Sequence, residues 1–150
     1  MNKCKRTCVC KIRGLSSQRQ LNDLRRQGLF TDLQIHSNDG QTLDAHKLVL
    51  YYLGTTFQKS FGNGKELQDI IHLDLPFHAV EELLNFAYGS GCTLTSANIN
   101  VLMEFALEFG IKGLEKIGSD FLKTNLSCEN ALFAYNFAKK CSCPDMQANV

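Results

Sequence analysis

The sequence predicts an α+β domain in which a small mixed β-sheet is covered by a cluster of α-helices. Two observations lead to this prediction: short alternating segments occur early in the 150-residue chain, and amphipathic helical patterns follow them to its end. The composition, 44% hydrophobic and 21% charged, is that of an ordinary globular protein. There is no run of about 18 apolar residues, so no transmembrane helix is expected.

The strands are predicted from alternation of apolar and polar residues. In the segment TDLQIHS, Leu33 and Ile35 fall on one face of an extended chain. The 38–40 segment (NDG) predicts a hairpin turn, because glycine tolerates the positive φ of a tight turn, and 41–43 continue as the second strand. Residues 69–73 (DIIHL) predict a third short strand.

The helices are predicted from apolar residues three and four positions apart, with glycines where the patterns stop. Thr95 and Ser127 are predicted N-caps, because their hydroxyls can accept a backbone hydrogen bond at the start of a helix. The predicted helical segments are 18–28, 45–54, 55–61, 76–89, 95–110, 111–126 and 127–141.

The charge is unevenly distributed along the chain. Residues 1–26 hold eight Lys or Arg and one Asp, although the whole chain is close to neutral. Such an arm could touch nucleic acid or an acidic partner, but it has no interleaved aromatic residues, so a solvated tail is the preferred interpretation. Residues 1–17 are therefore predicted to be a disordered basic N-terminal arm, and nucleic acid is not an expected partner.

The seven cysteines are predicted to be free thiols. Their number is odd and no secretory signal precedes them, which favours a reducing compartment, the cytoplasm or also the nucleus. The cysteines and four histidines lack the C-x₂-C pairs of structural zinc sites, so no metal is expected.

Residues that could support catalysis are few. His46 lies close to Asp44 and Asp32, but no nucleophile motif such as G-x-S-x-G is present. No P-loop and no G-x-G-x-x-G motif occurs either, so no cofactor is expected. The sequence therefore predicts a binding module and not an enzyme, with no small-molecule substrate and no membrane association.

The order of elements and several residues resemble the BTB/POZ family. The segment from Leu29 to Phe61 is similar to the opening of that domain, and FHAVEELLNFAYGS is similar to its next helix. The resemblance rests on the following residues: Phe30, Asp32, Ala45-His46-Lys47, Leu48, Leu50, the pair Phe57 and Phe61, and Tyr88-Gly89.

The resemblance implies a BTB/POZ domain over 18–125 and a partial helical BACK segment over 126–150, as in kelch-type proteins. We expect either a short form without kelch repeats or a truncated form of a longer kelch-like protein. The family dimerises through its first helix, so the chain is expected to pair with itself or with another BTB protein. The expected dimer interface comprises Leu21, Leu24, Asp32 and His46.

The resemblance also implies a cullin scaffold as a partner, in a ubiquitin ligase complex. Phe57 and Phe61 share one helical face, and the loop after them contains Glu66 where cullin-binding relatives have a glutamate. Gly64 occupies the place of that motif's hydrophobic residue, which weakens the expected contact. The chain is thus predicted to be a substrate adaptor or a competitor of one. The alternative is a transcriptional regulator that recruits co-repressors.

Overall fold

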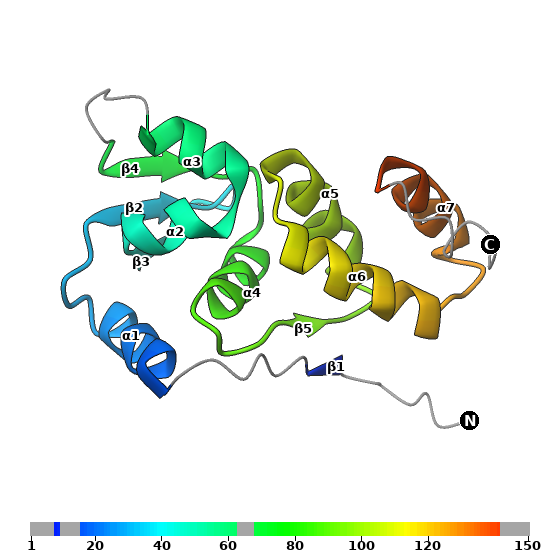
Figure 1. Cartoon of the computed structure of the whole chain (residues 1–150), viewed down its shortest axis with the longest axis horizontal. Helices are drawn as coiled ribbons and strands as arrows, with labels where there is room; N and C mark the ends of the chain where they lie inside the picture. Colours follow the sequence, from blue (N-terminus) through cyan, green and yellow to red (C-terminus); the bar gives the residue numbers. More distant parts are fainter. Residues whose placement is uncertain (1–7, 10–15, 63–67, 142–150) are drawn as a thin grey trace. The chain divides into compact units, whose positions relative to one another are not determined.

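The computed structural model describes residues 8–9, 16–62 and 68–141. It divides into two compact units, one formed by residues 11–92 and the other by residues 1–10 together with 93–150. Within the described residues, no helix is both long enough and apolar enough to cross a membrane. The elements of both units are labelled in Figure 1.

In its described residues, the unit formed by residues 11–92 contains a three-stranded sheet and four helices, which are labelled in Figure 1. Its elements are α1 (Ser16–Arg26), β2 (Leu33–His36), β3 (Thr42–Ala45), α2 (Lys47–Leu53), α3 (Thr55–Gly62), β4 (Ile70–His72) and α4 (Phe77–Ala87). The strand order is β3-β2-β4. β2 pairs antiparallel with β3 and parallel with β4, so the predicted small mixed sheet is confirmed.

The alternation in β2 separates the two faces of this sheet. Leu33 and Ile35 are buried on the inner face, while Gln34 and His36 lie on the outer face. The predicted hairpin turn is present, and Gly40 has a φ of 83°. The sequence pattern therefore determines which side of the sheet the helices cover.

Asp39 in this turn also caps the start of a helix that is distant in sequence. Its Oδ2 accepts a hydrogen bond from the backbone N–H of Phe77 at 2.9 Å, at the first turn of α4. Hydrogen bonds from the Ser37 hydroxyl and from the Phe77 amide lower the pKa of Asp39 below its ordinary value. The hairpin turn thus supplies the cap that Pro76, the N-cap residue of α4, cannot supply with its own side chain.

The second unit contains β1 (Cys8–Val9), β5 (Thr93–Leu94), α5 (Ile99–Phe109), α6 (Lys112–Thr124) and α7 (Ala131–Lys140). β1 pairs antiparallel with β5. α5 ends at Gly110, which has a φ of 67° and so takes the left-handed conformation of a helix C-cap. The buried residues of the three helices follow the apolar spacing of the sequence.

Two predicted N-caps are wrong. α5 begins at Ile99 after Asn98, and α7 begins at Ala131 after Asn130, so each helix starts later than Thr95 and Ser127 predicted. In both places an asparagine Oδ1 accepts a backbone N–H three residues earlier, at 2.8 Å. These bonds close a turn ahead of each helix.

The N-terminal arm differs in part from its prediction. Cys8 and Val9 form a strand, and α1 starts at Ser16, two residues before the predicted boundary at 18. The short strand β5, which pairs with them, has no alternation long enough to predict it from sequence. The other residues of 1–15 lie outside the described residues.

Close packing between α5 and α6 depends on Gly118. A Cβ placed on this residue would overlap the Sδ atom of Met103 on α5. We predict that Gly118→Ala destabilises the fold by about 1–3 kcal/mol, because the Met103 side chain must be displaced from a buried position. Urea denaturation should show the loss as a lower midpoint.

The control for this prediction is Gly113→Ala on the same helix. Gly113 is exposed, and alanine favours helix over glycine by about 1 kcal/mol, so this variant should be neutral or more stable. Equal destabilisation of both variants would show that the close approach of Gly118 to Met103 is not the cause.

Candidate functional site

Helix α1 buries polar residues and leaves its leucines partly accessible. Asn22 and Arg25 are 3% and 4% exposed, whereas Leu21 and Leu24 are only half-buried. The Nε of Arg25 donates to Asn22 Oδ1 at 2.9 Å, and Asn22 Nδ2 donates to the Ser90 hydroxyl at 2.8 Å. These hydrogen bonds hold the polar side of α1 against the rest of the unit. Leu21 and Leu24 therefore lie on a side of the helix that is partly exposed to solvent.

Tyr88, just after α4, is the centre of this polar attachment. Its side chain is 1% exposed, and the guanidinium carbon of Arg25 lies 5.4 Å from the ring centre. The Tyr88 hydroxyl accepts the backbone N–H of His46 at 2.9 Å and lies 2.6 Å from His46 Nδ1. One phenol therefore connects α1, the start of α2 and the end of α4.

The hydrogen bonds define the tautomer of His46. Its Nε2 lies 3.1 Å from the carbonyl oxygen of Leu29, which can only accept, so Nε2 carries the proton. Nδ1 then accepts the hydroxyl proton of Tyr88. Both ring nitrogens of His46 are satisfied, and the ring holds the α1–β2 loop against α2.

Burial shifts the pKa values of two groups in this network. Loss of water around the phenol raises the pKa of Tyr88 to about 12, and burial lowers the pKa of Arg25 below its ordinary value. Both shifts reflect a site that excludes solvent. Tyr88 is therefore a neutral hydrogen-bonding group throughout the physiological pH range.

Gly89 allows α1 to approach α4 closely. It has a φ of 69°, and a Cβ there would collide with the side chain of Gln18. The backbone conformation requires glycine at this position, and the missing side chain leaves room for that of Gln18. The Tyr88-Gly89 pair thus combines an anchoring phenol with room for the helix that it anchors.

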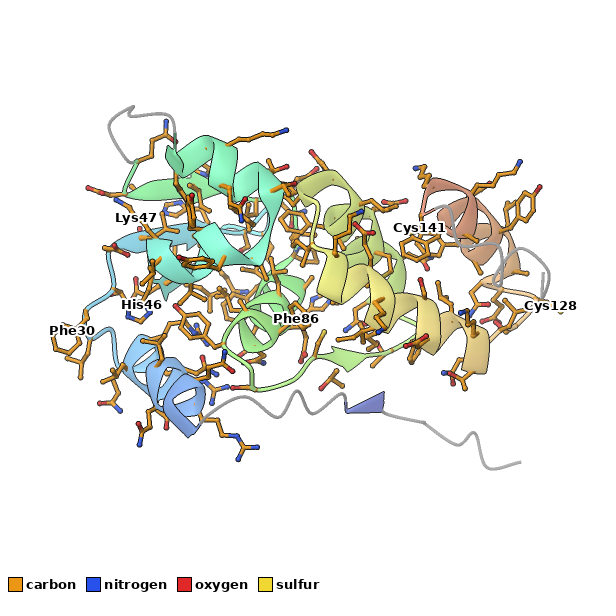
Figure 2. The ribbon with its side chains drawn as sticks, viewed as in Figure 1. Phe30, His46, Lys47, Phe86, Cys128 and Cys141 are labelled. Carbon is orange, nitrogen blue, oxygen red and sulfur yellow. The ribbon has the colours of Figure 1, made fainter. Side chains whose placement is uncertain are left out.

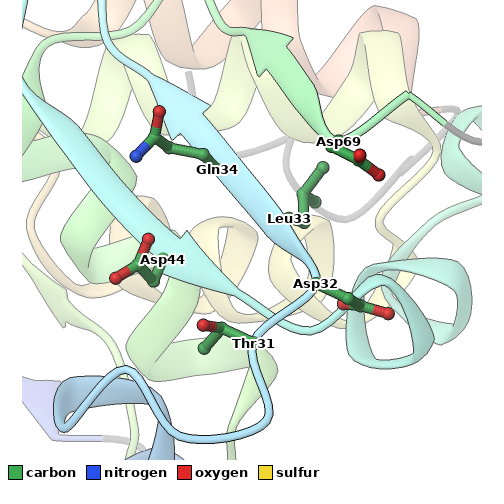
Figure 3. A pocket seen from close by; sticks show the side chains of 6 residues that line it. All are labelled: Thr31, Asp32, Leu33, Gln34, Asp44 and Asp69. Carbon is green, nitrogen blue, oxygen red and sulfur yellow. The ribbon is translucent and has the colours of Figure 1, made fainter.

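A second set of polar contacts lies where β2 begins. Asp32 Oδ1 accepts the backbone N–H of Lys47 at 2.7 Å and so caps α2, since the N-cap residue His46 makes no side-chain cap. Lys47 Nζ pairs with Asp69 at 2.6 Å. These residues adjoin a shallow pocket of about 420 Å³ (Figure 3). Its lining consists of Thr31, Asp32, Leu33, Gln34, Asp44 and Asp69.

Large apolar side chains are exposed on either side of the His46 network. In the α1–β2 loop, Phe30 is 83% exposed and has a φ of 59°, a conformation that costs a non-glycine residue about 1–2 kcal/mol. Figure 2 shows it pointing away from the unit formed by residues 11–92. On α2, Leu48 and Tyr52 are 68% and 75% exposed, one helical turn apart. We call Leu29, Phe30, Leu48, Tyr51 and Tyr52 the apolar face.

The predicted aromatic pair on α3 is arranged as its spacing suggests. Phe57 is buried at 3% exposure, and Phe61 is partly exposed, with the two ring centres 6.1 Å apart. Gly64 and Glu66, the other two residues of the predicted cullin contact, lie outside the described residues. Of the four residues predicted for this contact, the structure therefore describes only Phe57 and Phe61.

The chemistry of the remaining polar groups is limited. Among the described residues, no group of three or more His, Cys, Asp or Glu side chains could hold a metal ion. Cys128 is an exposed free thiol. His46, the candidate catalytic histidine of the sequence, is buried and bonded to a phenol and a carbonyl, which suits a structural role.

Comparison with known protein families matches the chain to the BTB/POZ domain over residues 21–126. The chain belongs to the BTB/POZ domain family. This agrees with the helix-covered mixed sheet and makes the chain a member of a family of protein-interaction domains. The match begins within α1, extends through α6 and ends before α7.

Relatives of this BTB/POZ chain are named for kelch repeats. Kelch repeat and BTB domain-containing protein 1 of Vaccinia virus (strain Copenhagen) is 28% identical over 125 residues, 80% of this chain and 22% of the relative. Kelch repeat and BTB domain-containing protein 8 of Mus musculus is 24% identical over 80% of this chain and 20% of its own length. Kelch-like protein 23 of Pongo abelii is 29% identical, with 80% and 22% covered. The chain spans about a fifth of the length of these relatives.

The structure brings three of the four residues predicted for the BTB dimer interface to one region. His46 is buried in the network, Asp32 caps α2 beside it, and Leu24 is half-buried on the helix that the network holds. The sequence prediction missed Arg25 and Asn22, whose polar character suggested exposure. It also gave no role to Tyr51, although two adjacent aromatics on one short helix were a usable signal.

We predict that Tyr88→Phe destabilises the BTB domain by about 1–3 kcal/mol, because it leaves the His46 amide and Nδ1 buried without a partner. Chemical denaturation measures this loss. Tyr52→Phe, at a residue 75% exposed, is the matched control and should change the free energy of unfolding very little.

The raised pKa of Tyr88 gives a second measurement on the same variant. In the unfolded chain a tyrosine ionises near pH 10, whereas folded Tyr88 ionises at about 12. The unfolded state therefore loses its proton first, and stability falls as the pH rises from 10 to 12. Tyr88→Phe should reduce this alkaline loss, and an unchanged slope would contradict the assignment.

Proposed function

We propose that this chain is a dimerising interaction module that pairs with a second copy or with another BTB protein through α1 and the apolar face. The observation that carries the proposal is the inverted burial of α1. A helix that buries Asn22 and Arg25 and leaves Leu21 and Leu24 half-exposed has apolar surface for a partner to cover. In a two-fold dimer the same patch serves both copies.

The four residues expected at the interface would then have two different roles. Leu21 and Leu24 would contact the partner directly. Asp32 and His46 would position the interface without contacting the partner. Asp32 caps α2, and His46 is hydrogen-bonded to the carbonyl oxygen of Leu29. Phe30 would add an aromatic anchor, which explains why a strained backbone is kept at a highly accessible side chain.

Light scattering tests the proposed dimer. The intact chain should have about twice its 16.8 kDa mass at micromolar concentration. Leu21→Asp with Leu24→Asp should shift it toward monomer, because two carboxylates would be buried in the interface. Phe30→Asp should do the same without disturbing a buried position.

The matched control is Leu132→Asp on α7, which is 73% exposed and lies in the other unit. This variant should keep the mass of the parent chain. A parent chain that is a clean monomer, and that pairs with no other BTB domain, would contradict the proposal.

A second proposed role is contact with a cullin scaffold, as adaptor or as competitor. The names of the relatives place kelch repeats beside a BTB domain, and α3 carries a partly exposed aromatic next to the 63–67 segment. Glu66 would supply the charge of the contact and Gly64 would lack its hydrophobic anchor. An aromatic anchor commonly contributes about 2 kcal/mol, or roughly thirtyfold in affinity, so the native contact would be weak.

Binding to a cullin N-terminal region tests this role. Gly64→Met should tighten the complex by up to about thirtyfold, and Phe61→Ala and Glu66→Ala should loosen it. Lys59→Ala, at an exposed residue of the same helix, is the control. If the Gly64→Met chain binds no cullin, the adaptor role fails.

Failure of cullin binding together with a stable dimer would favour the competitor role or the alternative, recruitment of transcriptional co-repressors. Residues 126–150 are proposed to be the start of a BACK segment, to which α7 contributes a helix. The cytoplasm, or also the nucleus, is the compartment proposed for all of these roles, and the exposed free thiol of Cys128 is compatible with it.

A further inference from the structure

Two histidines meet on the outer face of the sheet, away from the His46 network. The strands β2 and β4 are neighbours in the sheet (Figure 1), and His36 on β2 and His72 on β4 are direct partners in their parallel register. Residues in register on neighbouring strands project to the same side of a sheet, so both imidazoles lie on the outer face. His72 is exposed and His36 is partly exposed, so ions in solution can reach both rings.

The separation of the two rings matches that of two imidazoles on one metal ion. Their centres are 4.9 Å apart and the ring planes cross at 70°. A metal about 2.0–2.1 Å from a ring nitrogen lies roughly 3.2 Å from that ring's centre, so two cis ligands have centres roughly 4.5–5.2 Å apart. The two rings are therefore close enough to share one ion.

The hydrogen bond to Gln34 sets the tautomer of the His36 ring. Its Oε1 lies 2.9 Å from His36 Nε2 and can only accept, so Nε2 carries the proton and the lone pair is on Nδ1. Metal-binding histidines are commonly oriented in this way, by donating the second ring N–H to an oxygen. A ligand nitrogen and its orienting partner are thus both present on β2.

We propose that His36 and His72 form a two-imidazole site for a late divalent transition metal such as Zn²⁺. Imidazole nitrogen is a preferred ligand of zinc, copper and nickel, and no third His, Cys, Asp or Glu of the described chain completes a larger set. Water would fill the other positions, so the affinity is modest. A bound ion would tie the short edge strand β4 to β2.

Zinc titration of the intact chain tests the site directly. Accessible thiols are first alkylated on the folded protein, because seven cysteines would otherwise compete for zinc. Nitrogen-15 spectra of the histidine rings should then show saturable shifts at His36 and His72, with one zinc per chain. His46 and His78 should not shift, since His46 is buried and bonded and His78 lies on α4.

Substitutions distinguish the two proposed zinc ligands, His36 and His72, from a histidine that is not expected to bind zinc. His72→Gln and His36→Gln should each weaken zinc binding by at least about tenfold, and Gln34→Ala should weaken it by about tenfold through loss of orientation. His78→Gln is the matched control and should bind zinc like the parent. Circular dichroism without zinc checks that each variant is folded.

Thermal unfolding gives a second readout. Zinc should raise the unfolding temperature of the parent and of His78→Gln, because an ion that binds only the folded chain stabilises it. The increase should be absent in His72→Gln, whose altered residue is exposed and needs no repacking. Equal zinc affinity of His72→Gln and His78→Gln, or zinc-dependent shifts at other histidines alone, would overturn the proposal.

Discussion

The hydroxyl of Tyr88 is the group on which the arrangement of the unit formed by residues 11–92 depends. It lies at the end of α4 and satisfies two polar atoms of His46, while Arg25 of α1 rests over its ring. The Nε2 atom of His46 is in turn hydrogen-bonded to the carbonyl oxygen of Leu29. In a buried site each of these polar groups is costly without its partner, so the network determines a single position for α1 and for the loop that follows it.

This polar attachment explains the unusual surface of α1. A helix held by its apolar face would bury Leu21 and Leu24 completely and would expose Arg25. Here the hydrogen bonds of Asn22 and Arg25 turn the leucines partly outward, and the same network positions Leu29 beside the exposed Phe30. The internal chemistry of the domain and its proposed docking surface are therefore two consequences of one set of contacts.

The sequence predicts this fold well where a residue's partners are close along the chain. Alternation located β2 and the hairpin, and spacing placed Phe57 and Phe61 on one face of α3. Prediction failed where the deciding partner is remote or competes locally. Asn22 and Ser90 are 68 positions apart, and Asn98 closes a turn that overrides the predicted cap at Thr95.

The sheet explains why such remote links are needed. It has three strands of three or four residues, which is too little paired backbone to position the surrounding helices by itself. Single side chains position them instead. Asp32, just before β2, caps the N-terminus of α2, and Asp39 in the hairpin turn caps the N-terminus of α4. Among the described residues, the outer face of the sheet is partly open to solvent, since Gln34 and His36 are partly exposed and His72 is exposed. The His36 and His72 rings lie on that face, where a ligand could reach them without disturbing the contacts that hold α1.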